Sequence, residues 1–383
     1  MKKPLDIVFV GLCLSSSWGN GHATTFRSLI RGLDAAGHRV LFLERETPWY
    51  ATRRDLPDPD FCELVYYDDP LAMTTAYAAR LRQADAVIIG SYVPDGVAVI
   101  DAIEALGPKR LCFYDIDTPV TLEKLNRNDE EYLARRQIPL FDIYFSFTGG
   151  ETLDRLERRY GARRAEALYC SVDGKRYRNS GDDFLWDLGY LGTYSPDRQP
   201  RLEELLIEPA RQLRHMRFVV AGPQYPSTIS WPENVERIEH LPPASHPGFY
   251  SRQRFTLNVT RADMVAAGWS PSVRLFEAAA CGTPIISDFW RGLEELLPEN
   301  EAIVIARSTE DVVKALTSIE EGDRQAIATA AQRRILSLHT GETRAGELTA
   351  YLSEIPERLP ETEKHLIRLQ NRESEYAETK SSY

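Results

Sequence analysis

This sequence lacks three features: long hydrophobic runs, an excess of positive charge, and cysteines at metal-binding spacings. The first apolar run, residues 7–10, is short, follows Asp6 and lacks a small-residue cleavage site after it. We therefore expect a buried strand there, with no signal peptide and no transmembrane segment in the chain. The five cysteines are odd in number and widely spaced. This pattern favours reduced thiols in a cytoplasmic protein over disulfides or a metal site.

The charge balance excludes one large class of partners. Asp and Glu number 57 against 46 Lys and Arg, which gives a formal net charge of −11. Proteins that bind nucleic acid carry an excess of positive charge, so we expect no nucleic-acid partner. An anionic ligand would instead require a local cluster of arginines. The length of 383 residues favours two domains.

The first half of the chain alternates apolar strand patterns with polar loops and helical segments. Runs at residues 6–12, 40–44, 86–90 and 110–114 are continuous and rich in apolar residues, as in parallel strands buried on both faces. This predicts a doubly wound α/β domain with ligand groups at the carboxyl ends of its strands. The candidates in those loops are Asn20, Gly21, His22, Ser91, Asp115 and Asp117. For His22, a structural hydrogen-bonded role is an equal alternative.

Asp115 and Asp117 admit a second interpretation. An apolar strand that ends in Asp-x-Asp can hold a divalent cation beneath a diphosphate. In that case the first domain would bind the diphosphate compound and its reaction partner, and the second half of the chain would not be expected to contain a nucleotide site. Residues 268–288 of the second half, described below, do have the pattern of a nucleotide site. We therefore expect no metal, and we assign both aspartates to the acceptor side of a cleft or to helix capping.

A second strand-and-helix series follows a polar segment near residue 175. Strand patterns occur at residues 188–194, 217–222, 235–241 and 255–259. We therefore predict domains at 1–175 and 176–353, followed by a charged tail at 354–383.

The most informative segment is residues 268–288. A polar loop leads into a helix that begins at Pro271 or Ser272 and ends at Gly282, before a buried strand. Free N–H groups and the helix dipole, with Arg274 in the first turn, predict an anion site. Glu277 lies one turn further on, where its carboxylate can accept hydrogen bonds from sugar hydroxyls. The alternative is an ordinary N-cap followed by a solvated glutamate.

This segment also carries a family resemblance. The run Leu-Phe-Glu-Ala-Ala-Ala-Cys-Gly-Thr-Pro-Ile-Ile at 275–286 resembles the nucleotide-sugar signature of retaining GT-B glycosyltransferases. Residues 270–282 and 286–294 are most similar to the CgeB-type (spore-maturation) family. The resemblance implies two Rossmann-like doubly wound domains facing a cleft, with the acceptor on the first domain and the nucleotide sugar on the second. It also implies that the last helices, one of them near residues 324–338, cross back onto the first domain.

The resemblance also implies roles for individual residues. Arg198 and Arg274 would neutralise the leaving diphosphate, with Arg201 as a second choice after Arg198; exposed helix-start arginines that bind nothing are the alternative. His240 and Leu241 would lie beside the nucleobase. Further donor contacts are expected from Gly222, Pro223, Asn258, Arg261, Ser272 and Val273.

One position departs from the family pattern. Many retaining relatives have two glutamates separated by seven residues in this loop and helix. Glu277 occupies the second position, but Trp269 occupies the first. A neutral indole cannot stabilise positive charge at an anomeric carbon, although it can stack on a sugar face as a substrate contact.

The implied activity is transfer of a sugar from a UDP-, GDP- or dTDP-sugar to a hydroxyl of a glycan, a small molecule or a protein. No metal or cofactor is expected, and retention is the expected outcome, with the leaving phosphate taking the proton. In an inverting enzyme, Asp117 or His22 would be the base. Two alternatives stay open: a non-catalytic nucleotide-binding scaffold on a GT-B frame, and a nucleotide-sugar epimerase.

Overall fold

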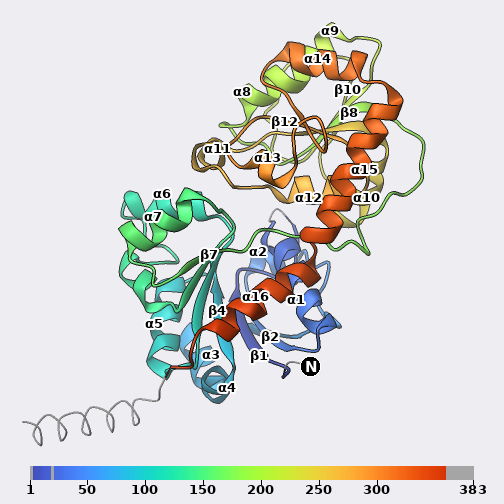
Figure 1. The fold of residues 1–383 in the computed structure, drawn as a ribbon. Helices are drawn as coiled ribbons and strands as arrows, with labels where there is room; N and C mark the ends of the chain where they lie inside the picture. The colour runs from blue at the N-terminus through green and yellow to red at the C-terminus, as the bar shows by residue number, and fades with distance from the viewer. Residues whose placement is uncertain (1–2, 19–20, 359–383) are drawn as a thin grey trace, which may run out of the picture.

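The computed structural model describes residues 3–18 and 21–358 and contains two α/β domains, each built on one parallel sheet (Figure 1). The first sheet has the strand order β3-β2-β1-β4-β5-β6-β7. Its strands are β1 (Asp6–Gly11), β2 (Arg39–Arg45), β3 (Glu63–Tyr67), β4 (Ala86–Gly90), β5 (Leu111–Asp115), β6 (Ile143–Ser146) and β7 (Ala165–Ala167). Its helices are α1 (His22–Ala35), α2 (Pro48–Ala51), α3 (Pro70–Ala76), α4 (Ala78–Gln83), α5 (Gly96–Leu106), α6 (Thr118–Asn126), the 3-10 helix η1 (Arg135–Leu140) and α7 (Glu151–Tyr160).

The second sheet has the order β10-β9-β8-β11-β12-β13. Its strands are β8 (Trp186–Leu191), β9 (Phe218–Ala221), β10 (Val235–Ile238), β11 (Gln253–Asn258), β12 (Ile285–Ser287) and β13 (Val304–Ile305). Its helices are α8 (Gln199–Leu202), the π-helical turn η2 (Glu203–Ile207), α9 (Glu208–Gln212), the 3-10 turn η3 (Pro243–Ser245), α10 (His246–Ser251), α11 (Ala262–Ala267), α12 (Val273–Ala280), α13 (Leu293–Leu296), α14 (Thr309–Ser318) and α15 (Glu321–Leu338). The predicted pair of doubly wound domains is confirmed.

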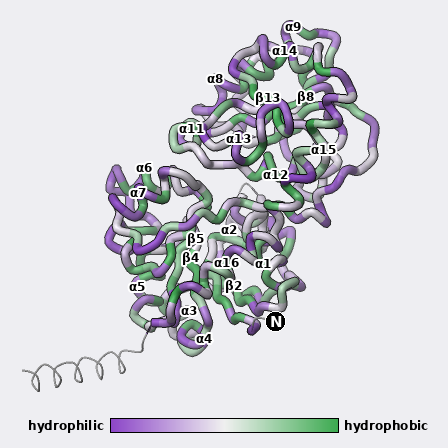
Figure 2. The backbone as a smooth tube through the Cα atoms, in the orientation of Figure 1, coloured by the Kyte–Doolittle hydropathy of each residue, from purple (hydrophilic) through white to green (hydrophobic). Residues whose placement is uncertain are grey.

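The continuous apolar runs arise because each central strand is covered on both faces. In β1, Val8 and Val10 belong to one core cluster, while Ile7 and Phe9 belong to the cluster on the opposite face. Figure 2 shows the strands of this domain as largely hydrophobic inside a more polar outer layer. None of the described helices combines the length and the apolar character needed to cross a membrane.

Each sheet reverses its strand order next to its first strand. The chain runs from β1 to β2 and β3 on one side, and then returns to β4 on the other; β8 has the same relation to β9 and β11. In open parallel sheets, ligands bind beyond the carboxyl ends of the strands at this point. The topology therefore places the candidate site in loops that follow β1, β8 and β11.

The last described helix, α16 (Gly341–Glu354), belongs to the first domain. In Figure 1 it lies across α1, and Ala345, Leu348 and Leu352 join the core cluster beneath it. The crossing expected of the last helices is thus made by α16 and not by residues 324–338. The corresponding helix, α15, packs on α12 of the second domain, where Gln332 donates a 2.9 Å hydrogen bond to the carbonyl of Ala280.

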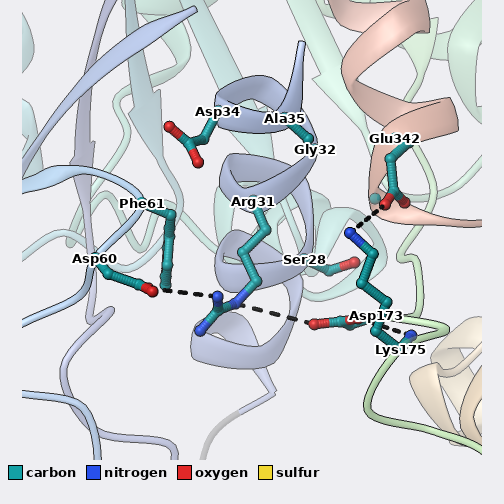
Figure 3. A pocket seen from close by; sticks show the side chains of 11 residues that line it. Ser28, Arg31, Gly32, Asp34, Ala35, Asp60, Phe61, Asp173, Lys175 and Glu342 are labelled. Atoms are coloured by element: carbon teal, nitrogen blue, oxygen red, sulfur yellow. Dashed lines mark hydrogen bonds and ion pairs between the residues drawn. The ribbon is translucent and has the colours of Figure 1, made fainter. Parts of the chain in front are cut away.

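The two segments that connect the domains lie side by side. Val172 N donates to the carbonyl of His339 at 3.0 Å, and Gly341 N donates to the carbonyl of Val172 at 3.3 Å. Beside them, a hollow of about 160 Å³ is bordered by paired charges (Figure 3). Arg31 lies 3.5 Å from Asp60 and 3.9 Å from Asp173. The pair with Asp173 joins α1 to the connection between the domains, and the pair with Asp60 joins α1 to the loop before β3. The charges beside the hollow therefore have a structural role.

Candidate active site

A cavity of about 570 Å³ lies at the carboxyl ends of both sheets and has walls from both domains. The first domain contributes the loop after β1, the start of α1 and α2. The second domain contributes the loops after β8, β9, β10 and β11 together with α12. Many of the predicted residues line this cavity: Gly21, Arg198, Gly222, Pro223, His240, Leu241, Arg261, Val273, Arg274 and Glu277.

Three arginines from different elements give one end of the cavity a positive charge. Arg198 is largely enclosed and donates to the carbonyl of Thr193 at 2.6 Å, while its buried Nε has no hydrogen-bond partner among the described residues. Burial lowers its pKa, and the neighbouring charges of Arg274 and Arg261 lower it further. Among the residues that the structure describes, only Arg261 of these three has a carboxylate within ion-pair distance, with its Nε 3.7 Å from Asp197. A diphosphate would relieve this repulsion.

The first turn of α12 fixes the orientation of Arg274. Arg274 Nη1 donates to Asn258 Oδ1 at 2.8 Å, and Ser272 Oγ donates to the same oxygen at 2.9 Å. Ser287 Oγ accepts from the Asn258 amide at 2.9 Å. The structure thus brings Asn258 and Ser272 behind Arg274 and not to the cavity surface, which corrects the predicted contacts of these two residues with substrate.

Glu277 forms the other charged part of the cavity. Its side chain is 4% exposed, so the alternative of a solvated glutamate is wrong. Tyr250 donates a 3.1 Å hydrogen bond to its Oε2, and His246 Nδ1 lies 3.6 Å from the same oxygen. His246 also lines the cavity, between Glu277 and the carbonyl of Leu241. His246 is not predicted from the sequence. The one signal that points to it is its position at the start of α10, after the loop that follows β10.

The predicted first-domain residues are only partly brought together. His22 Nε2 lies 3.4 Å from Asp117 Oδ2, and the imidazole packs edge-on against Tyr92. His22 is buried, and neither it nor Asp117 lines the cavity. Gly21 does line it, while Asn20 lies outside the described residues.

Asp115 and Ser91 hold the loops in shape and do not reach the cavity. Asp115 is fully buried and accepts hydrogen bonds from Tyr144 at 2.6 Å and Thr121 at 2.8 Å. Burial raises the pKa of Asp115 to about 6. Ser91 Oγ accepts from Ile116 N at 3.1 Å. The predicted substrate contacts from these two side chains therefore do not match their positions.

The Asp-x-Asp pattern does not present two free carboxylates. Asp115 also accepts a hydrogen bond from Asp117 N at 3.2 Å, so its oxygens are committed within the protein. Within residues 3–18 and 21–358, no cluster of three or more His, Cys, Asp or Glu side chains is arranged to hold a metal ion.

Trp269 turns away from the cavity. Its φ is +43°, and its indole packs against Gly150 and Gly292 at the domain interface. The indole N–H donates to Glu295 at 3.0 Å, while the Trp269 carbonyl accepts from Gly149 at 2.9 Å. The structure thus gives this residue a role in joining the domains, in place of the predicted sugar contact.

Arg201 also points elsewhere. It forms an ion pair with Glu204 and donates to the carbonyl of Arg307 at 3.1 Å. It does not line the cavity. Of the two arginines proposed in this loop, only Arg198 reaches the candidate site.

Comparisons with known proteins agree with this architecture. Residues 198–350 match the model of a family described as glycosyl transferase-like. No curated protein matches the chain. Similar solved structures include sucrose-phosphate synthase from Thermosynechococcus elongatus, with 13% identity, a TM-score of 0.66, and coverage of 91% of this chain and 98% of that one. Another is Anabaena HepE in complex with UDP-glucose, with 12% identity, a TM-score of 0.65, and coverage of 92% and 100%.

A glycosyltransferase from Rickettsia africae gives the same result, with 10% identity, a TM-score of 0.65, and coverage of 92% of this chain and 99% of that one. At these identities the structural similarity establishes the fold, and the family match covers most of the second domain and the start of α16. The chain therefore has the fold of GT-B glycosyltransferases, and its residues 198–350 match the glycosyl transferase-like family.

Proposed function

We propose that this protein transfers a sugar from a nucleotide sugar to a hydroxyl group of an acceptor. One observation carries the proposal: Arg198 and Arg274, which have no carboxylate partner among the described residues, share a cavity with the buried carboxylate of Glu277. Cations suit a diphosphate, and a carboxylate suits the two hydroxyls of a ribose. A nucleotide carries both groups.

The donor is proposed to lie along the second-domain wall. Its diphosphate would contact Arg198 and Arg274, its ribose would reach Glu277, and its base would lie near His240 and Leu241. UDP is the first nucleotide to test, because the similar HepE structures contain UDP or UDP-glucose. GDP- and dTDP-sugars are the alternatives, and the acceptor class of glycan, small molecule or protein stays open. The sequence of residues 270–294 supports a CgeB-type subfamily as a further part of this proposal.

The chemistry proposed is cleavage of the bond between the anomeric carbon and the phosphate oxygen, with formation of a bond between the same carbon and the acceptor hydroxyl oxygen. The arginines and the N–H groups of the first turn of α12 would stabilise the negative charge that develops on the leaving diphosphate, without a metal. Retention is supported by the acceptor-side wall. Within the described part of the chain, no first-domain carboxylate or imidazole lines the cavity. The leaving phosphate oxygen would then accept the proton of the acceptor hydroxyl.

A thermal-shift series with UDP, GDP and dTDP tests the donor site. We expect one nucleotide to raise the melting temperature and Glu277→Ala to abolish the shift. A shift that survives in this variant would contradict the ribose assignment. NMR of the nucleotide sugar incubated alone and with hydroxyl acceptors then separates transfer from epimerisation. Nucleotide binding without either reaction would identify a scaffold.

A further inference from the structure

The first-domain wall of the cavity contains two tryptophans. Trp18 follows β1, and Trp49 lies in α2, yet their rings meet at 4.6 Å between centroids and 72° between planes. Trp49 is 55% exposed, which is unusual for so large an apolar side chain. Both residues line the same cavity as Arg198 and Arg274. The pair, called the indole platform below, therefore faces the proposed donor.

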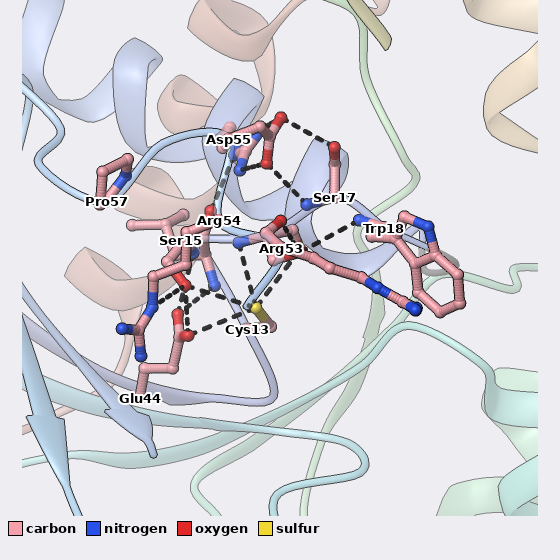
Figure 4. Close-up of polar contacts among 12 residues, drawn as sticks. Cys13, Ser15, Ser17, Trp18, Glu44, Arg53, Arg54, Asp55 and Pro57 are labelled. Atoms are coloured by element: carbon pink, nitrogen blue, oxygen red, sulfur yellow. Dashed lines mark hydrogen bonds and ion pairs between the residues drawn. The ribbon is translucent and has the colours of Figure 1, made fainter. Parts of the chain in front are cut away.

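The indole platform is held in place from outside the cavity. The guanidinium carbon of Arg53 lies 3.6 Å from the ring centroid of Trp18 and 4.8 Å from that of Trp49. Figure 4 shows Arg53 alongside the Trp18 indole. Arg53 does not line the cavity. A cation stacked on both rings favours one arrangement of the two indoles.

Hydrogen bonds to two carboxylates, the exposed Asp55 and the buried Glu44, fix the loop that carries Trp18. Asp55 accepts from Ser17 N at 2.9 Å and from Ser17 Oγ at 2.8 Å, and it is bound through both oxygens by Arg27. The buried carboxylate of Glu44 accepts from Leu14 N and Ser15 N. Figure 4 shows the contacts of Asp55 and of Glu44 as two groups next to the segment that carries Trp18. The tryptophans are thus presented on an ordered support.

The distribution of charge within the cavity is one-sided. Its charged side chains, Arg198, Arg261, Arg274 and Glu277, all come from the second domain. The first domain lines it with the indole platform, two hydroxyl residues and a glycine, as far as the described residues extend. An acidic acceptor would find no cation on this wall, and a peptide would find few polar partners. An uncharged ring with an apolar face and hydroxyls at its edge fits both features.

We propose that the indole platform is the acceptor subsite and that it stacks an uncharged pyranose ring. The inference rests on the proposed function, since it assigns the second substrate of the same cavity. Indoles offer a large, rigid apolar face to the C–H face of a sugar, while the ring hydroxyls stay free to hydrogen-bond. Arg53 is a positioning residue that acts through the two indoles.

Saturation-transfer NMR with defined probes tests this assignment on the full chain, both free and saturated with UDP. The probes are the methyl glycosides of glucose, galactose and N-acetylglucosamine, with methyl glucuronide as the acidic counterpart and sorbitol as a polyol without a ring. We expect at least one neutral glycoside to bind through its ring C–H protons, at least fivefold more tightly than sorbitol or the glucuronide.

Variants then locate the binding. Trp49→Ala should weaken glycoside binding at least fivefold, Trp49→Phe should restore part of it, and the UDP affinity should stay within twofold of the original. Arg53→Gln should also weaken glycoside binding, and Arg53→Lys should recover it. Phe184→Ala is the matched control, because Phe184 is 41% exposed and lies under Arg324 but does not line the cavity. It should change neither affinity.

Three results would overturn the assignment: no binding of any neutral glycoside, unchanged binding in Trp49→Ala, or preference for the glucuronide. The last result would indicate an acidic acceptor instead. The donor proposal can fail separately. If UDP did not bind while glycoside binding still depended on Trp49, the indole platform would stand and the proposed donor would be wrong.

Discussion

The guanidinium groups of Arg198 and Arg274 lie close enough to repel each other, and among the described residues neither has a carboxylate partner. The charge of Arg274 adds to burial in lowering the pKa of Arg198. Each donates instead to a neutral oxygen, of Thr193 and Asn258 respectively. A bound diphosphate would relieve this repulsion, so the arrangement of the two guanidinium groups suits an anion.

Replacing Arg198 by methionine should separate the contribution of Arg198 to nucleotide binding from its effect on the stability of the unliganded protein. We expect Arg198→Met to weaken UDP binding roughly 10- to 100-fold, since a hydrogen bond to a charged group contributes about 1.5–3 kcal/mol. The unliganded protein should keep or gain thermal stability, because a buried like charge has been removed. Calorimetric titration and thermal unfolding measure the two quantities.

Arg201→Met supplies the matched control for this experiment. Arg201 is in the same segment but pairs with Glu204 outside the cavity. Its replacement should leave the UDP affinity within about twofold, because the side chain does not line the cavity. The lost ion pair should reduce stability by at most about 1 kcal/mol. Equal losses of UDP affinity in the two variants would contradict the assignment of Arg198.

Trp269→Ala should act on stability and not on the donor. The indole fills the space between Gly150 and Gly292, where a Cβ added to either glycine would lie 2.4 Å from it. We expect a loss of about 2 kcal/mol, below the 3–5 kcal/mol of fully buried tryptophans because this one is half-buried. Urea unfolding measures the loss, and the UDP affinity should not change.

Trp269→Glu tests the departure from the family pattern. The indole N–H donates to Glu295, so a second carboxylate at this position would face a like charge. We therefore expect Trp269→Glu to be less stable than Trp269→Ala above neutral pH. Any gain of transfer rate in the glutamate variant would refute this interpretation and place residue 269 at the donor sugar.

Asp115 predicts a pH dependence of stability. Its folded pKa of about 6 is above the ordinary value of 3.8, so the folded state retains a proton that the unfolded state releases. The stabilisation is complete below pH 3.8 and is lost as the pH rises through about 6, with a difference on the order of 3 kcal/mol.

Asp115→Asn removes this titration while preserving the shape of the side chain. The free energy of unfolding, measured from pH 4 to pH 7, should fall in the original protein relative to the variant, mainly below pH 6. The loss of the acceptor oxygen in the variant lowers its free energy of unfolding by the same amount at every pH, so it does not affect the comparison of the two slopes. Parallel curves over this range would show that Asp115 does not retain its proton.

Two glycines of α16 predict opposite effects of the same substitution. In Gly341→Ala the new Cβ would lie 2.0 Å from the carbonyl oxygen of Ser28, so we expect a loss of more than about 2 kcal/mol. In Gly346→Ala nothing lies within 4 Å, and a gain of about 0.5–1 kcal/mol is expected from helix propensity. Chemical unfolding of both variants checks the packing of α16 on α1.

The sequence is sufficient for the parts of the site that depend on local geometry. Arg274 and Glu277 are three residues apart on one helix, so they lie about one turn apart whatever the rest of the fold does. The strands are recognisable because burial on both faces requires continuous apolar runs. The edge strand β7, with the sequence Ala-Glu-Ala, lacks such a run, and neither it nor the edge strand β3 is predicted.

The errors concern side chains whose direction is set by distant partners. Asp115 ends a strand at a predicted ligand-binding edge, but Tyr144 on the neighbouring strand takes its carboxylate. Trp269 is held by Gly150, which lies far away in the sequence. Trp18 in the loop after β1 and Trp49 in α2 meet in space, and no spacing in the sequence links them. The one local feature that can be read from the sequence is Pro48, which favours a helix start and so places Trp49 in the first turn of α2.

The position of α16 has a consequence for the order in which the protein is made. The face of α1 that α16 covers stays open until residues 341–354 have left the ribosome. Domains near the N-terminus generally fold first during synthesis, but here the first domain cannot be completed before the second has been translated. The second domain receives its own closing helix, α15, earlier. The two domains are therefore completed in the reverse of their order along the chain.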